Sequence, residues 1–407
     1  MLDRKRVLAL AQLTNSIGDG AYLVCSVLYF TLIVGLSPTQ IGFGLTLGWA
    51  VGSVAGVGLG HLADRRGPKG VAILLAITTA TAVGSFLFVR SFPAFVLAAV
   101  LYACAQGGLA AARQALLAGL VPPHERTKVR AFMQATANAG LAIGAALGGL
   151  ALWIGTKEAF LSVFALDAAC FLAAALVLTR LPTVAPAPAG KVGEPKLAVL
   201  RDRPYALLTL LNTVMLLYMP LLSLVIPLWI VQRTSAPHWM VSALLVLNTL
   251  SVVLFQVRIA RRVNGLDSAS RLVRHSGVLM LASCVVFALS AAGTSAWAAG
   301  LILLAAAGLQ VVGEMMLASG AWEISFDLAP ADKQGQYQGF FGTGIAIARM
   351  LGPLLLTTLI ITWGTVGWLV LGGLFLIAAL AITPAVKWAQ RRLPTPDSAD
   401  PAPALAR

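Results

Sequence analysis

The sequence predicts an all-α, polytopic membrane protein with twelve transmembrane helices in two pseudo-symmetric six-helix bundles. The first observation behind this is composition: the 407 residues are 59% hydrophobic and only 11% charged, whereas soluble domains carry about 25% charged residues. The second is periodicity, because no apolar run alternates every second residue as the strands of a membrane barrel do. The third is an internal repeat of the chain.

Twelve apolar segments are each long enough to cross about 30 Å of hydrocarbon as a helix. They cover residues 7–35, 39–62, 70–90, 93–120, 130–154, 158–180, 204–231, 238–260, 272–292, 297–328, 336–362 and 366–388. The first has the basic flank of a signal peptide, but it runs on to residue 35 without a clear cleavage site. We therefore interpret it as a retained first span.

The chain divides at a stretch rich in Pro and Ala, a composition that favours extended backbone. We predict an N-terminal six-helix bundle, a cytoplasmic linker, a C-terminal six-helix bundle and a disordered cytoplasmic tail. Their bounds are residues 1–180, 181–203, 204–390 and 391–407.

The two halves repeat each other without a gap. The shift that lays residues 121–123 on residues 329–331 also lays Gly144 on Gly352. The same shift places Gln106 opposite Glu314. Two parallel repeats with a binding site between them describe one transporter architecture.

Basic residues set the predicted orientation. Of the 29 Lys and Arg, all but four lie in one alternating set of loops, helix ends and termini. The exceptions are Arg90, Lys157 and Arg233 in the opposite set, and Arg349 inside a span. Positive loops stay on the cytoplasmic side, so both termini are predicted to be cytoplasmic. The net charge of +14 then reflects topology and attraction to anionic lipid, and nucleic acid is not an expected partner.

Five glycines recur at every fourth residue of the second span: Gly44, Gly48, Gly52, Gly56 and Gly60. On a helix they form one stripe, and a stripe without side chains lets another helix approach closely in lipid. The sequence then changes to the charged segment from His61 to Lys69. This change places the end of the span at a water interface.

The segment from Gly60 to Lys69 resembles the signature of the major facilitator superfamily in the loop after the second helix, Gly-x-Leu-Ala-Asp-Arg-x-Gly-x-Lys/Arg. The matching residues are Gly60, Leu62, Asp64, Arg65, Gly67 and Lys69. The resemblance implies a cytoplasmic gate in which Asp64 faces the positive N-terminus of helix eleven, which begins near Gln336. Arg65 and Lys69 would hold the loop through charge pairs, and Gly67 would permit the tight turn.

A second pattern lies in the fifth helix, as Gly140-x-x-x-Gly144-Ala145-x-x-Gly148-Gly149. It is similar to the Gly-x-x-x-Gly-Pro-x-x-Gly-Gly pattern of drug and proton antiporters in the superfamily, with Ala145 in place of the proline. The aligned Gly352-Pro353 of helix eleven keeps the glycine–proline pair. This resemblance favours export, and close helix packing alone is the alternative.

Ionisable side chains inside spans are costly unless they are paired or hydrated, so each is a functional candidate. Asp19 lies about 18 Å along the first helix at 1.5 Å per residue, and it shares one face with Asn15, Tyr22 and Ser26. We predict that this face meets a water-accessible cavity and that Asp19 binds a coupling proton. The alternative is a permanently hydrogen-bonded aspartate that packs the helix.

Glu314 and Arg349 form the second group, and Gln310 lies one turn before Glu314. Arg349 stays charged, so it needs a partner or a wet site; Glu314 is the expected partner and Asp19 the alternative. An arginine that switches between the two carboxylates would couple protons to transport, while a static buried pair would only fix helix register. We interpret Asp167 as structural.

Enzyme and metal chemistry have no support in the sequence. There is no Gly-Lys-Ser/Thr phosphate loop, no His-Glu-x-x-His and no Gly-x-Ser-x-Gly. The four His and four Cys lack metal-ligand spacing. We therefore expect no enzyme activity, no metal and no cofactor, with the proton as coupling ion.

Together these features predict a secondary active transporter in the plasma membrane of a bacterium, a monomer among membrane lipids. The leading hypothesis is proton-coupled export of a hydrophobic or amphipathic small molecule, such as a drug or antibiotic, by alternating access. One alternative is proton-coupled uptake of a small organic acid or other nutrient, with Arg349 binding a carboxylate. Another is a lipid scramblase or a non-transporting membrane receptor.

Overall fold

The computed structural model describes residues 4–188, 195, 197–292 and 295–392. All regular structure in these residues is helical. Parts of the predicted linker and nearly all of the predicted tail lie outside the described residues.

Six long helices make the N-terminal bundle: α1 (Arg4–Leu32), α2 (Pro38–Arg66), α3 (Pro68–Ser85), α4 (Phe92–Leu120), α5 (Pro123–Ile154) and α6 (Lys157–Thr179). Local sequence explains their ends. The Ser37 side chain and the Gln40 side chain cap the start of α2 reciprocally, which satisfies backbone groups that a helix start leaves free. Gly155 ends α5 in the left-handed conformation, a common helix stop.

The C-terminal bundle contains α7 (Arg203–Met215), α8 (Ile226–Arg233), α9 (Met240–Ala260), α10 (Leu266–Leu289), α11 (Ala296–Asp327), α12 (Gln334–Leu356) and α13 (Thr365–Gln390). Short 3₁₀ and π turns join α7 and α8 into one span, Arg203–Arg233. A π turn also follows Pro353 in α12. Proline removes a backbone donor and so interrupts the hydrogen bonding of an α-helix. A π turn is a local departure from regular α-helical hydrogen bonding.

Eleven helical segments in the described part of the chain are long and apolar enough to cross a membrane. The protein is therefore an integral, multi-pass membrane protein. α1, which carries Asn15 and Asp19, is not among the eleven. The twelve-span count, the cytoplasmic termini and the bounds of the bundles stay predictions.

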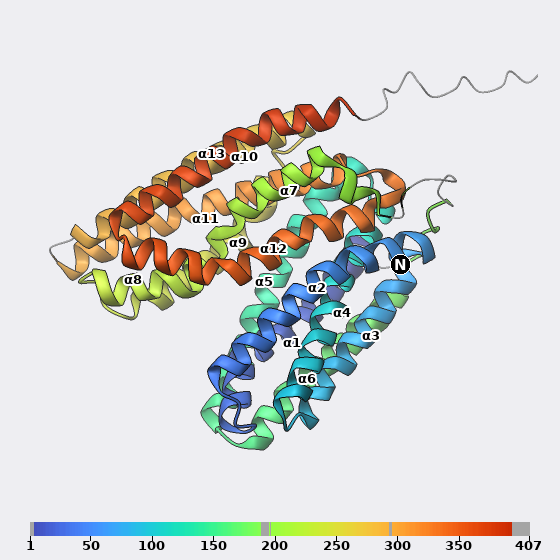
Figure 1. Cartoon of the computed structure of the whole chain (residues 1–407), viewed down its shortest axis with the longest axis horizontal. Helices are drawn as coiled ribbons and strands as arrows, with labels where there is room; N and C mark the ends of the chain where they lie inside the picture. The colour runs from blue at the N-terminus through green and yellow to red at the C-terminus, as the bar shows by residue number, and fades with distance from the viewer. Residues whose placement is uncertain (1–3, 189–194, 196, 293–294, 393–407) are drawn as a thin grey trace, which may run out of the picture.

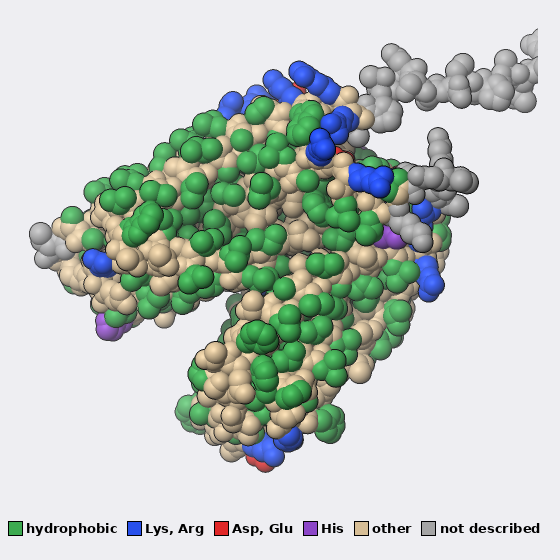
Figure 2. Space-filling model, viewed as in Figure 1, with side chains coloured by type: hydrophobic (Ala, Val, Ile, Leu, Met, Phe, Trp, Pro, Cys, Tyr) green, Lys and Arg blue, Asp and Glu red, His purple; other side chains and the backbone are tan. Residues whose placement is uncertain are grey.

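The two bundles meet at one end and diverge toward the other (Figure 1). We call the end where α2 ends and α12 begins the closed end, and the opposite end the open end. Figure 2 shows a deep cleft between the bundles that widens toward the open end. α2 and α12 make the largest contact between the bundles, and α5 with α9 the next.

Candidate functional site

The glycine stripe of α2 contacts two different helices. Toward the open end, it packs on α4 within the N-terminal bundle. A Cβ at Gly48 would lie 3.0 Å from the carbonyl oxygen of Ala99, and one at Gly52 would lie 2.7 Å from the backbone of Ala103. This part of the stripe holds one bundle together.

Toward the closed end, the stripe of α2 contacts α12 of the other bundle. A Cβ at Gly339 would lie 2.5 Å from the carbonyl oxygen of Gly56, and one at Gly60 would overlap the carbonyl oxygen of Gly335. Four glycines, two from each bundle, therefore let the two backbones touch. Any side chain there would hold the bundles apart.

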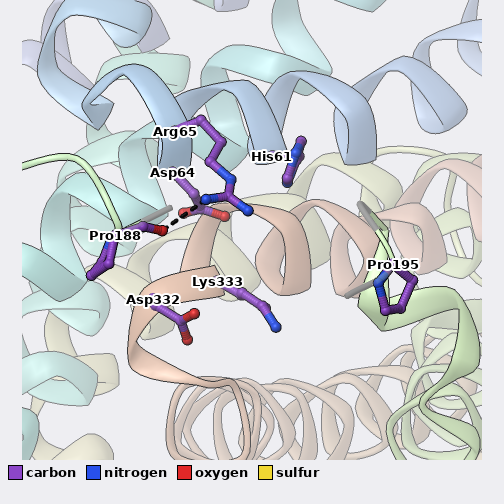
Figure 3. A pocket seen from close by; sticks show the side chains of 7 residues that line it. All are labelled: His61, Asp64, Arg65, Pro188, Pro195, Asp332 and Lys333. Carbon is purple, nitrogen blue, oxygen red and sulfur yellow. Dashed lines mark hydrogen bonds between the residues drawn. The ribbon is translucent and has the colours of Figure 1, made fainter. Parts of the chain in front are cut away.

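Asp64 binds the start of α12, as the signature implies. Its Oδ1 accepts a hydrogen bond from the backbone N–H of Gly335 at 2.7 Å, and its Oδ2 one from that of Gln336 at 2.9 Å. These amides are among the four that a helix N-terminus leaves without a partner inside the helix, and a carboxylate is favoured there. Figure 3 shows Asp64 and Arg65 on α2 across a small pocket from Asp332 and Lys333. The contact joins the two bundles at the closed end.

Arg65 and Lys69 hold the linker rather than forming charge pairs, which corrects the sequence-based expectation. Arg65 donates to the carbonyl oxygen of Pro188 at 2.7 Å, drawn as a dashed line in Figure 3. Lys69 Nζ donates to the carbonyl oxygens of Thr179 and Leu181 at 2.8 and 2.5 Å. The carbonyls at the end of α6 have no partner within the helix, so a lysine beside them satisfies them.

Gly67 supplies the turn between α2 and α3, as expected. Its φ is +92°, a region that residues with a Cβ rarely adopt. The linker crosses this turn: the backbone N–H of Ala187 donates to the carbonyl oxygen of Asp64 at 2.7 Å, and Val184 packs on Gly119 of α4. The signature segment is thus held by the start of α12 and by the linker.

A second contact between the bundles at the closed end involves Glu323 of α11. Its Oε2 accepts a short hydrogen bond from the hydroxyl of Thr127 on α5. Its Oε1 accepts another from the backbone N–H of Gly265, at 3.0 Å, in the loop before α10. Glu323 is 6% exposed, so water competes little for either bond.

Substituting Thr127 by valine is expected to weaken the closed end without loosening either bundle. The variant loses one hydrogen bond to a carboxylate, about 1.5–3 kcal/mol, and keeps the bond from Gly265. Distances between spin labels at the closed end should therefore shift toward separated bundles. Thr136→Val is the matched control, because that exposed hydroxyl on the same helix bonds only to the carbonyl oxygen of Phe132. Equal distributions in the two variants would exclude Thr127 from the closure.

The glycines of α5 pack within the N-terminal bundle. Gly140, Gly144 and Gly148 all lie against the backbone of α1, and a Cβ at Gly144 would overlap the carbonyl oxygen of Ile17. A Cβ at Gly149 would have no neighbour within 4 Å. Close packing of α5 on α1 therefore accounts for three of these glycines, and the link of the pattern to antiport stays a prediction.

Gly352 of α12 has a comparable packing role in the other bundle. A Cβ there would lie 2.5 Å from the ring of Pro220, in the irregular segment between α7 and α8. Pro353 follows inside α12, one helical turn before the π turn that begins at Thr357. The two irregular stretches of the C-terminal bundle therefore pack against each other.

Asp19 is partly exposed and is held by neutral donors. Its Oδ1 accepts from Gln106 Nε2 at 3.1 Å and from the Tyr102 hydroxyl at 3.4 Å, both on α4. The two donors also bond to each other at 3.0 Å. Two positive charges act on Asp19, Arg113 of its own bundle more strongly than Arg349. This set gathers side chains that the sequence placed on separate helices.

The rest of the predicted polar face of α1 is buried, contrary to the expectation that it meets a wet cavity. Asn15 is 1% exposed and Tyr22 8% exposed. Tyr22 stacks with Phe86 and contacts Phe164 edge-on. This face of α1 therefore packs in the aromatic core of the N-terminal bundle, and only Asp19 remains partly exposed.

Glu314 is the partly exposed acid of the other bundle, and it too has neutral partners. Its Oε2 accepts from Asn248 Nδ2 of α9 at 2.8 Å, and the Tyr218 hydroxyl lies beside the same carboxylate. Gln310, one turn earlier, is 4% exposed, and its Oε1 has no hydrogen-bond partner. No helix-spacing rule connects Asn248 with Glu314, so the sequence alone did not pair them.

The expected ion pair between Glu314 and Arg349 is not formed. Arg349 is exposed, and its guanidinium lies 5.6 Å from the ring centre of Trp49 on α2. Among the described residues the ion pair within 4.0 Å is that of Lys5 with Glu125. Arg349 thus contacts the N-terminal bundle through an aromatic ring, an arrangement that holds a cation without neutralising it.

Comparisons with known proteins decide the family. The profile of the Major Facilitator Superfamily matches residues 8–353. The chain belongs to the Major Facilitator Superfamily. It is therefore a transporter of small molecules from a superfamily of secondary transporters, whose members are generally not enzymes.

This transporter is similar to one curated protein in sequence and to two solved structures in fold. An uncharacterized MFS-type transporter of Escherichia coli, YdeE, is 24% identical over 357 residues, which cover 86% of this chain and 88% of the relative. A bacterial homologue of the iron transporter ferroportin, in an outward-facing state, superposes with a TM-score of 0.75 at 17% identity, over 96% of this chain and all of that one. The proton:xylose symporter XylE gives 0.71 at 14% identity, over 94% and 95%.

Proposed function

We propose that this transporter exports a hydrophobic or amphipathic small molecule, such as a drug or antibiotic, in exchange for protons. One observation carries the proposal: each bundle presents a partly exposed carboxylate, Asp19 or Glu314, that only neutral groups hold by hydrogen bonds. A carboxylate held in this way can gain or lose a proton without breaking an ion pair. Ionisable groups within a membrane commonly mark proton pathways.

The contacts at the closed end supply the conformational part of the cycle. If the closed end is cytoplasmic, as the distribution of Lys and Arg predicts, this arrangement opens outward. A proton from outside would then neutralise Asp19 or Glu314 and change the field on Arg349, which lies between the bundles on Trp49. We propose that this change favours release of the closed-end contacts and that substrate drives the return.

Asp19→Asn is expected to abolish export that a pH gradient drives, with at least a tenfold loss of accumulation, while the protein still folds and inserts. The amide can accept a hydrogen bond from Gln106, but it cannot take up a proton. The measurement is compound efflux from cells or inverted vesicles over a range of external pH. Glu158→Gln, an exposed acid at the open end, is the control and should leave efflux unchanged. Full transport by Asp19→Asn at every pH would remove Asp19 from the mechanism.

Uptake of an organic anion is the second candidate, and one observation favours it. Arg349 is exposed and forms no ion pair among the described residues, so its charge is available to a carboxylate. Counterflow in proteoliposomes separates the two: exchange of organic acids that Arg349→Gln abolishes supports uptake, whereas exchange of lipophilic cations supports export.

Proteins with this fold carry different substrates. The third candidate function, a lipid scramblase, is tested by whether the activity requires a proton gradient. Solved relatives with similar folds include one named as a homologue of an iron transporter and one as a xylose symporter. Within the described residues no three His, Cys, Asp or Glu side chains gather as a metal site. Lipid scrambling needs no gradient, so lipid movement that persists with an uncoupler would favour a scramblase.

A further inference from the structure

Asp167 of α6 is a fully buried acid that the proposed function does not use. Its side chain is 0% exposed, and neither carboxyl oxygen has a hydrogen-bond partner. Transfer of a lone carboxylate into an apolar interior is among the costliest steps in protein energetics. An ionised Asp167 is therefore not compatible with these surroundings.

The packing around Asp167 explains why no donor reaches it. The carboxyl lies against Gly18 of α1, where a Cβ would overlap Oδ1. The backbone N–H groups of α1 at this point already bond within the helix. Gly18 thus makes room for the acid but offers no hydrogen bond to an ionised form.

The titratable groups that face Asp167 offer it no paired cation. Asp19 is the acid whose charge acts on it from α1. Tyr22 of α1 and Tyr102 of α4 interact with Asp167 as well, and on its own helix Cys170 does so. Two further helices pack on α6, and their ionisable residues lie at the closed end: Lys69 on α3, and those of residues 124–130 at the start of α5. A carboxyl that faces another acid and no paired cation is more stable in its neutral, protonated form.

We propose that Asp167 is a second proton-binding site, occupied by a proton in this conformation, behind the partly exposed Asp19. Two acids that act on each other are not ionised together at low cost, so the proton on Asp167 is linked to the charge of Asp19. The proton would leave through Asp19 when the packing of α1 on α6 changes. Occupancy of the site stands on the burial of Asp167; its part in transport rests on the proposed function.

Infrared spectroscopy of the full-length protein in lipid vesicles tests the occupancy directly. A protonated carboxyl has a carbonyl stretching band that an ionised carboxylate lacks, and labelled aspartate identifies the residue type. At neutral pH we expect this band in the wild type, its loss in Asp167→Asn and its persistence in Asp19→Asn. Identical carbonyl spectra for the wild type and a folded Asp167→Asn would overturn the proposal.

A second variant keeps the test decisive if Asp167→Asn does not fold. Asp167→Glu retains the acid, so the band should respond to labelled glutamate instead of labelled aspartate. A band that responds only to labelled aspartate in this variant would assign the proton to another residue and refute the proposal. Neither readout depends on transport, so failure of the export assay would overturn the proposed function and leave these results to decide on Asp167 by themselves.

Discussion

Gly60→Ala is expected to separate the two bundles at the closed end. The added Cβ would overlap the backbone carbonyl of Gly335, and a backbone has little room to yield. Overpacking typically costs about 1–3 kcal/mol, and about 1.4 kcal/mol corresponds to a tenfold change in an equilibrium constant. We therefore expect the ratio of closed to separated molecules to fall about tenfold while each bundle stays folded.

The distance between spin labels at Arg66→Cys and Ala331→Cys measures this change, because both positions are exposed at the closed end. The four native cysteines, which are buried or partly buried, are first replaced. Gly58→Ala is the matched control on the same helix, since a Cβ there would have no neighbour within 4 Å. A Gly60→Ala distribution that matches that of Gly58→Ala would show that the α2–α12 contact does not limit closure.

Asp64→Asn is expected to open the same end by removing a different interaction. Asp64 accepts from two backbone N–H groups at 2.7 and 2.9 Å. Asparagine keeps one acceptor but presents an NH₂ group to the other donor, so at least one charge-assisted bond is lost, about 1.5–3 kcal/mol. The same pair of labels should report an increase of about tenfold or more in the ratio of separated to closed molecules.

The control for Asp64→Asn removes the same charge at the same end of the molecule. Asp332 is exposed, lies across the pocket from Asp64 and is not a partner of the Gly335 and Gln336 amides. Asp332→Asn should leave the distance distribution close to that of the wild type. If both variants open the closed end equally, general electrostatics rather than the cap on α12 would account for the effect.

The sequence predicted a contact correctly where the chemistry of a side chain indicates what kind of group it binds. A carboxylate at the end of the second helix suits a helix N-terminus wherever the fold brings one near, so the contact of Asp64 with α12 was predictable from the signature. Arg65 and Lys69 were assigned wrongly because their acceptors are backbone carbonyls of the linker and of the end of α6. The linker has no helical or strand periodicity, so the sequence does not predict where its backbone carbonyls lie.

Contacts between helices were harder to predict than positions along them. Asp19, Glu314 and Arg349 do lie within their helices, as hydropathy indicated. Their partners depend on how each helix is rotated about its own axis, and α12 leaves regular geometry after Pro353. Arg349 accordingly lies on Trp49 instead of pairing with Glu314.

Proton movement that substrate triggers tests the central claim most directly. Purified protein in proteoliposomes, with a pH-sensitive dye inside and no imposed gradient, is given a lipophilic cation on one side. The account predicts proton flow opposite to the substrate, loss of that flow in Asp19→Asn and no loss in Glu158→Gln. Substrate entry without any pH change, equal in the wild type and Asp19→Asn, would contradict proton-coupled exchange.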